Sequence, residues 1–154
     1  MDQTISDRIE VYVQRVQNLS TFGAAFLYDV FKLVESLGIT MTDGDCWLLG
    51  FCVQQIEQEI KNSCNVSSVP FGLFKAASGL IVARFLSAKR AKDGMSAEMS
   101  ALNFSPVLKE LSEGDTKLVY AVDSATSPEQ RLDQFLGLLE SGRNQFVTYR
   151  RIRW

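Results

Sequence analysis

The 154-residue sequence contains no histidine and only three prolines and three cysteines. Histidine is the commonest general base and a frequent metal ligand, so its absence removes many acid–base and metal-dependent mechanisms. The sequence also has no phosphate-binding glycine loop and no nucleophile-elbow motif. We therefore predict that the protein is not an enzyme, and we predict no catalytic, cofactor-binding or metal-binding residue.

The three cysteines are Cys46, Cys52 and Cys64. Their spacing fits no metal-ligand motif, and an odd number leaves one unpaired in any disulfide scheme. Cys46 and Cys52 fall inside an apolar helical pattern, which predicts buried, reduced thiols. Reduced thiols favour the cytosol. The sequence predicts no signal peptide, and no apolar stretch approaches the roughly 18 residues of a membrane span, so we expect no membrane partner.

Positive charge is concentrated at the carboxyl terminus. The chain has a net charge of −2, but residues 143–154 contain four arginines and no acidic residue, which leaves −6 on the remainder. A protein that coats nucleic acid would usually be basic over one face. A mildly acidic body with a basic tail instead suits a tail that binds an acidic or aromatic surface.

Hydrophobic periodicity predicts a single, mainly α-helical domain over residues 1–154, with a helical bundle at about 4–92. Gly38 is placed to end one helix, and Thr42 to begin the next. Pro70 is placed to open a further helix that ends before Gly94, and that helix is rich in small residues that permit close approach of a neighbour. The clearest stripe of helical spacing consists of Trp47, Leu48, Phe51, Cys52, Ile56 and Ile60.

After this bundle the pattern changes. Residues 93–106 are predicted to be a mobile linker. Residues 107–112 and 116–122 are short and β-prone, and Glu113-Gly114-Asp115 between them indicates the turn of a β-hairpin rather than a catalytic loop. An isolated hairpin is marginally stable, so we expect it to pack on the helices or on another subunit. The residues predicted to contact a subunit or line a channel are Leu111, Glu113, Gly114, Asp115, Thr116, Leu118 and Tyr120.

The last helix is predicted to begin at Ser127 and Pro128, and the helix with its tail covers about 127–154. The tail ends in Tyr149-Arg150-Arg151-Ile152-Arg153-Trp154. Arginine and tryptophan are enriched among the residues that dominate binding energy at interfaces, so this ending predicts a docking peptide. The alternative is a frayed helix end whose arginines complement the helix dipole.

Two of these segments together resemble the head–tail connector, or adaptor, family of tailed bacteriophages and prophages. The family pattern has a serine-rich strand, an E-G-D-T turn, an apolar strand, a helix and a closing Y-R-x-x-x-W. This chain has Glu113-Gly114-Asp115-Thr116, then Leu118-Val119-Tyr120, then the helix, then Tyr149 to Trp154. The helix from Val82 to Arg90 is also similar to the family's central helix, and the resemblance covers about residues 43–154.

The resemblance implies a structural protein of the virion, assembled at the head–tail interface after synthesis in the host bacterial cytoplasm. It implies a ring of about twelve copies that continues the DNA channel and contacts DNA without sequence specificity. The implied partners are further copies of the chain, the portal protein above the ring, and a stopper or tail-completion protein below it. The tail, Tyr149 to Trp154, would dock on the portal.

A second hypothesis is a small helical DNA-binding or regulatory protein. Its Arg-rich tail, with the cationic segment Lys89, Arg90 and Lys92, would contact phosphate. The two hypotheses differ in salt dependence, because binding to phosphates weakens steeply as salt rises. For Lys89, Arg90 and Lys92, an interaction with the helix dipole is the simpler interpretation.

Overall fold

The computed structural model describes residues 3–17, 20–111 and 127–151, and these residues are mainly α-helical. The long helices are α1 (Gln3–Gln17), α2 (Ala24–Ser36), α3 (Asp43–Cys64), α4 (Phe74–Asp93) and α8 (Pro128–Glu140). The short helices are α5 (Ala97–Ser100), α6 (Ser105–Leu111) and α9 (Phe146–Tyr149), with 3-10 turns η1 (Phe71–Leu73) and η2 (Ser141–Gln145).

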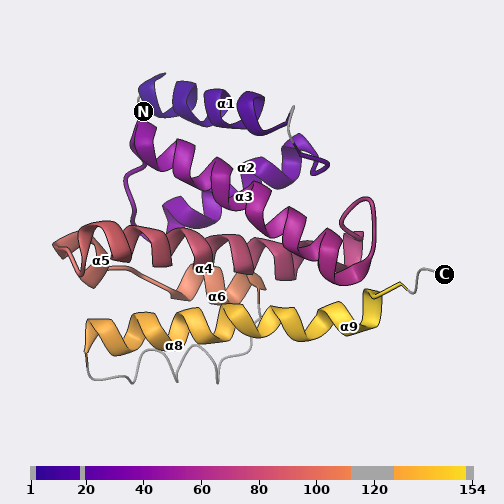
Figure 1. Cartoon of the computed structure of the whole chain (residues 1–154). Helices are drawn as coiled ribbons and strands as arrows, with labels where there is room; N and C mark the ends of the chain where they lie inside the picture. The colour runs from indigo at the N-terminus through magenta and orange to yellow at the C-terminus, as the bar shows by residue number, and fades with distance from the viewer. Residues whose placement is uncertain (1–2, 18–19, 112–126, 152–154) are drawn as a thin grey trace.

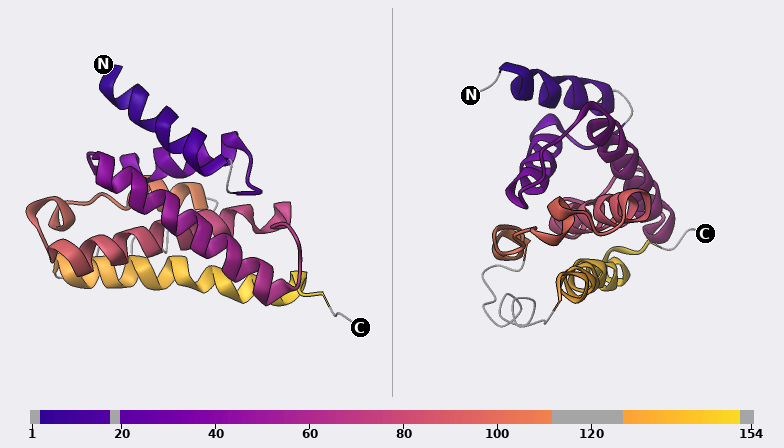
Figure 2. Two further views of the ribbon diagram at one scale, coloured as in Figure 1. Left: turned by 45° about the horizontal axis from the view of Figure 1, so that its top comes forward. Right: turned by 90° about the vertical axis from the view of Figure 1, so that its left-hand side faces the viewer.

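The helices stack in successive layers, as Figure 1 shows from α1 at the top to α8 at the bottom. Helix α1 packs on α2 and α3, and α4 lies beneath them in contact with α2, α3, α6 and α8. The two views in Figure 2 confirm that α1 and α8 occupy opposite sides of the molecule. Helix α4 is therefore the central element.

The central position of α4 explains its composition. The segment Phe71–Asp93 is long and apolar enough to cross a membrane by length and composition alone, and 61% of its most apolar window is buried inside the protein. The prediction that no apolar stretch approaches that length was therefore wrong. A helix that packs on neighbours all round is apolar all round, so burial accounts for this composition.

Most helix ends follow the predicted residues. Gly38 has φ +99° directly after α2, a conformation that favours glycine. Thr42 accepts a hydrogen bond from the Asp45 backbone N–H, while the Asp45 side chain accepts one from the Thr42 N–H, which completes a capping box. Ser127 caps α8, with Pro128 in its first turn. These predictions are confirmed.

The buried face of α3 differs from the predicted stripe. Trp47 and Phe51 are 52% and 46% exposed, and their rings stack with centroids 5.7 Å apart. The close approach of α1 at Gly50 accounts for the shift, because an added Cβ there would lie 2.8 Å from Val16 of α1. The buried α3 residues are Cys46, Leu49, Gly50, Cys52, Val53, Ile56, Glu57, Ile60 and Cys64.

The predicted linker and the first predicted strand are wrong. Within 93–106, Met99, Leu102 and Phe104 are buried, and the Asn103 N–H donates to the Leu37 carbonyl at 3.0 Å. Residues 107–111 belong to α6, which packs on α2 and α4. Packing against helices overrides the β-propensity of this short segment. The remainder of the predicted hairpin falls in 112–126, outside the described residues.

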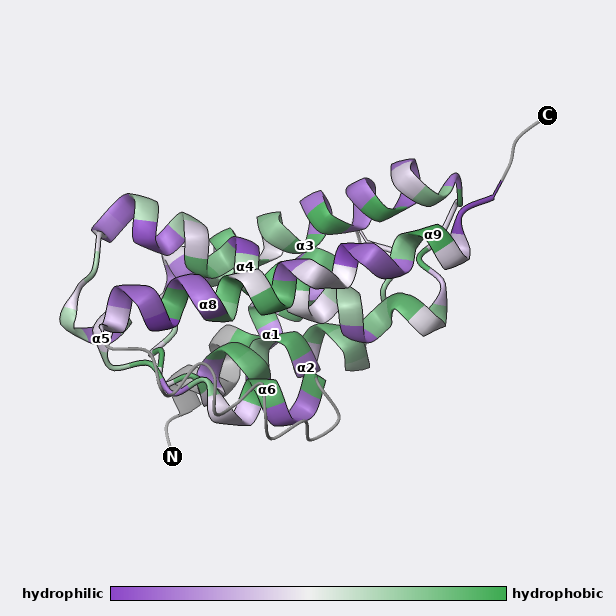
Figure 3. Ribbon diagram, turned by 90° about the horizontal axis from the view of Figure 1, so that it is seen from below, coloured by the Kyte–Doolittle hydropathy of each residue, from purple (hydrophilic) through white to green (hydrophobic). Residues whose placement is uncertain are grey.

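Small residues bring α4 close to the last helix, as predicted. A Cβ at Gly79 would lie 3.4 Å from the Leu139 side chain, and one at Gly142 would lie 3.3 Å from Ala76 Cβ. Helix α8 ends at Glu140, and the chain continues as the 3-10 turn η2 from Ser141. In Figure 3, α8 alternates between hydrophilic and hydrophobic residues, as expected for a helix with one buried face.

One buried carboxylate secures the turn between α1 and α2. Glu57 of α3 is 3% exposed and accepts hydrogen bonds from Ser20 Oγ (2.6 Å) and from the Thr21 N–H (2.8 Å) and Oγ1 (2.5 Å). It also pairs with Lys61 at 2.9 Å. Burial alone would raise the pKa of Glu57, but these hydrogen bonds outweigh it and lower the pKa. The carboxylate of this pair is buried, and Lys61 is half-buried.

Candidate functional site

The carboxyl-terminal peptide lies against the end of the bundle where α3 stops and η1 begins. In Figure 1, α9 lies beside the loop that connects these two elements. Phe146 is buried, and Tyr149 is half-buried against Gly72. A Cβ at Gly72 would lie 1.8 Å from the Tyr149 hydroxyl oxygen, so this ring occupies the space that a side chain would need.

Backbone contacts continue this docking through Arg151. The Arg151 N–H donates to the Cys64 carbonyl at 2.8 Å, and the Asn65 side-chain amide donates to the Arg151 carbonyl at 3.0 Å. Arg150 Nε donates to the Ser63 carbonyl at 3.1 Å. The last carbonyls of a helix lack partners within the helix. The tail thus caps α3, and its arginine also complements the negative end of the helix dipole.

The structure therefore separates the predicted docking tail into two parts. Tyr149, Arg150 and Arg151 contact the chain's own α3 and η1, whereas residues 152–154 lie outside the described residues. Arg150 lies at the carboxyl end of α3, which agrees with the alternative that the arginines complement a helix dipole. The role of the tail in docking on a partner stays a prediction.

Two exposed apolar side chains flank this end of the molecule, and the sequence analysis missed both. Phe71 in η1 is 85% exposed, and Val147 in α9 is 68% exposed. Phe71 directly precedes Gly72, which contacts the Tyr149 ring. Asn65 was missed as well. It has a left-handed conformation (φ 54°) directly after the last residue of α3, a position that favours glycine or asparagine.

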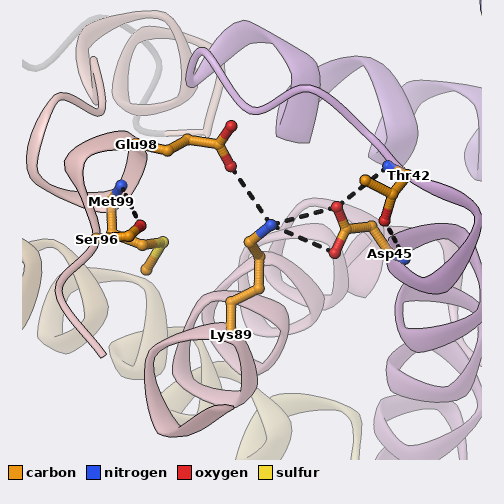
Figure 4. Close-up of polar contacts among 6 residues, drawn as sticks. All are labelled: Thr42, Asp45, Lys89, Ser96, Glu98 and Met99. Carbon is orange, nitrogen blue, oxygen red and sulfur yellow. Dashed lines mark hydrogen bonds and ion pairs between the residues drawn. The ribbon is translucent and has the colours of Figure 1, made fainter. Parts of the chain in front are cut away.

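Lys89 and Arg90, for which phosphate contact was the less favoured interpretation, are paired within the protein. Lys89 is 8% exposed and its ammonium lies 3.2 Å from Asp45 and 3.4 Å from Glu98 (Figure 4). Arg90 pairs with Asp133 at 2.5 Å. Lys89 thus joins the start of α3 to α4 and α5, and it is not presented to a phosphate.

A second ionic cluster uses the first arginine of the basic end. Arg143 makes a bidentate contact with Glu59, at 2.9 and 3.1 Å, and also pairs with Glu140. Arg84 approaches the same Glu59 carboxylate at 3.5 Å. Arg143 therefore stabilises the packing of η2 on α3 and α4, and the charge of the basic end is partly neutralised within the chain.

All three cysteines are buried free thiols, as predicted for Cys46 and Cys52. Cys64 donates a weak hydrogen bond to the Phe146 carbonyl, with sulfur and oxygen 3.6 Å apart. Burial raises the pKa of Cys52 to about 11, against a smaller lowering effect of Arg84. Within residues 3–17, 20–111 and 127–151, no three acidic, cysteine or histidine side chains converge as a metal site would require.

A different exposed feature lies between α1 and α3. The Arg15 guanidinium carbon lies 5.9 Å from the centre of the Trp47 ring, which stacks on Phe51. A cation at this distance from an aromatic ring is attracted to its face. This aromatic–arginine group lies on α1 and α3, apart from the tail, and the sequence had placed both rings in the core.

Comparisons with known proteins do not assign this arrangement, because no protein-family model, curated protein or solved structure gives a significant match. Of the residues predicted to contact another subunit or a channel, Leu111 is half-buried in α6. The others, from Glu113 to Tyr120, lie outside the described residues. The resemblance to the connector family therefore rests on the sequence motifs.

Proposed function

We propose that this protein is a head–tail connector, or adaptor, of a tailed bacteriophage or prophage. Copies of the chain would form a closed ring of about twelve beneath the portal and continue the DNA channel towards the tail. The ring would bind the portal protein on one side and a stopper or tail-completion protein on the other. The location implied is the head–tail interface of the virion.

The observation that carries this proposal is the terminal peptide. The sequence closes with the family pattern from Tyr149 to Trp154, and the peptide is anchored through Arg151 at one end of a helical bundle. Exposed Phe71 and Val147 lie on the elements that hold it. Apolar side chains and arginine are typical of interfaces, and the sequence adds a tryptophan at position 154.

The pairing of the cations supports the adaptor over the DNA-binding alternative. Lys89, Arg90 and Arg143 each contact carboxylates of the same chain. A neutralised cation contributes little to the release of counterions that drives binding to phosphates. The proposal therefore assigns the basic end to protein recognition.

The test is a pull-down with the portal protein encoded in the same genome. The double variant Arg153→Ala with Trp154→Ala removes two anchors beyond the part of the tail that caps α3. We expect the wild type to bind the portal, and the double variant to retain its helical fold and lose binding. Equal capture of both proteins would overturn the docking role. Binding of duplex DNA that weakens steeply with salt, without portal binding, would support the alternative.

A further inference from the structure

Two residues outside the tail, Gly72 and Asn65, contact it directly. Gly72 is the first. Among the described glycines, positive φ values occur at Gly38 and Gly94 but not at Gly72, so the backbone of Gly72 does not call for glycine. Its requirement is one of space, because an added Cβ would lie 1.8 Å from Tyr149 Oη, 2.6 Å from Cζ and 3.1 Å from Cε1. An alanine here would displace the Tyr149 ring.

Asn65 is the second. Its backbone N–H donates to the Lys61 carbonyl, which ends α3, and its side-chain amide donates to the Arg151 carbonyl at 3.0 Å. Both backbone polar groups of Arg151 are thus hydrogen-bonded, the N–H to the Cys64 carbonyl and the carbonyl to the Asn65 side chain. Two bonds to one residue fix the position of Arg151 against the end of α3.

We propose that Gly72 and Asn65 are positioning residues for the docking peptide. The seat consists of Ser63, Cys64, Asn65 and Gly72. It holds Tyr149 to Arg151 at one fixed place on the bundle, from which the remainder of the docking peptide would bind the portal. A peptide fixed in its bound direction loses less conformational freedom on binding, which raises its affinity. This inference rests on the proposed function and adds the residues that act through the tail.

Three single substitutions separate positioning from general stability. Gly72→Ala displaces Tyr149, and Asn65→Gly retains the left-handed backbone while removing the side-chain donor. The matched control is Gly137→Ala in α8, where an added Cβ would meet no atom within 4 Å. For each protein we would measure the affinity for immobilised portal protein, the rate of tryptic cleavage after Arg150 and Arg151, and the melting temperature.

We expect Gly72→Ala and Asn65→Gly each to accelerate cleavage and to weaken portal binding at least about tenfold, the order of one lost hydrogen bond or more. Gly137→Ala should change neither property. If Gly72 acts through Tyr149, then adding Gly72→Ala to Tyr149→Ala should weaken binding no further. If Gly72→Ala fails to fold, the Asn65→Gly result decides alone.

Faster cleavage with unchanged portal affinity would overturn the positioning role and leave the adaptor function standing. Unchanged cleavage in both variants would also overturn it, because the seat would then not be what holds the tail. Failure of the wild-type chain to bind the portal would overturn the proposed function and the positioning role together. In that case the cleavage rates would still report on the contacts of the seat.

Discussion

The buried carboxylate of Glu57 offers the sharpest test of the fold. Glu57→Gln keeps the size of the side chain and removes its charge. The amide can still accept from the Thr21 N–H and donate to Ser20 Oγ, so hydrogen bonds are retained but weakened. The Lys61 contact is lost as an ion pair. Hydrogen bonds to charged groups contribute roughly 1.5–3 kcal/mol and neutral ones roughly 0.5–1.5. We therefore expect a loss of about 2 kcal/mol.

The assay is urea denaturation followed by circular dichroism at pH 7 and at a series of lower pH values. The pKa of Glu57 is lowered in the folded protein. Its contribution is therefore fully present above the unfolded pKa of about 4.3 and is lost as the pH falls through the lower folded pKa. The difference between wild type and Glu57→Gln should be constant near neutrality and shrink below about pH 4.

The matched control is Glu35→Gln, because Glu35 pairs at 3.2 Å with Lys32, which is 67% exposed. An exposed pair of this kind contributes less than about 1 kcal/mol. Two results would contradict the stabilising role of Glu57 at the α1–α2 turn. One is a loss of unfolding free energy at pH 7 no larger for Glu57→Gln than for Glu35→Gln, and the other is a loss that grows as the pH falls.

Three further outcomes follow from particular contacts. Lys89→Ala should lower the free energy of unfolding by about 2–4 kcal/mol, because the Asp45 and Glu98 carboxylates lose their shared cation. Chemical denaturation of Lys89→Ala and Lys89→Met together shows whether the lost volume or the lost charge dominates. Phe71→Ser should leave the melting temperature within about 2 °C of wild type, since the ring is 85% exposed, yet weaken portal capture; unaltered capture would remove Phe71 from the docking surface. Cys52, which is 1% exposed and has a pKa of about 11, should react with a thiol reagent at pH 8 only after unfolding, and rapid labelling of the native protein would contradict its burial.

The ends of the helices were predictable from sequence where local chemistry decides them. Thr42, Ser127 and Pro128 act within one helical turn, and Gly38 marks a backbone conformation that few residues adopt. The close packing of the small residues of α4 was also predictable, because residue volume limits how near two helices approach.

Features that depend on tertiary contacts were not predictable. Helices α5 and α6, with four and seven residues, are too short to show a clear helical period, and their burial comes from packing on α2, α4 and α8. The face that α3 buries depends on where α1 sits over Gly50, so Trp47 and Phe51 were misplaced. Glu57 has the polarity of a surface residue, and only the turn at Ser20 reveals why it is buried.

Only part of the candidate site was predictable, because its other features also depend on tertiary contacts. The composition of the last six residues indicated a docking peptide, but the partners of Tyr149 and Arg151 lie far away in sequence. The sequence shows that Gly72 is small, but not that Tyr149 lies against it. Asn65 carries a short-range signal, since asparagine just after a helix often adopts the left-handed conformation.

The most direct measurement of the central claim is the mass of the complex formed when the purified chain is mixed with assembled portal rings from the same genome. The account predicts a discrete complex that contains about twelve copies of this chain per portal ring. It also predicts that the complex is absent with the Arg153→Ala, Trp154→Ala double variant. Portal rings that remain at their own mass in the presence of excess wild-type chain would contradict the claim.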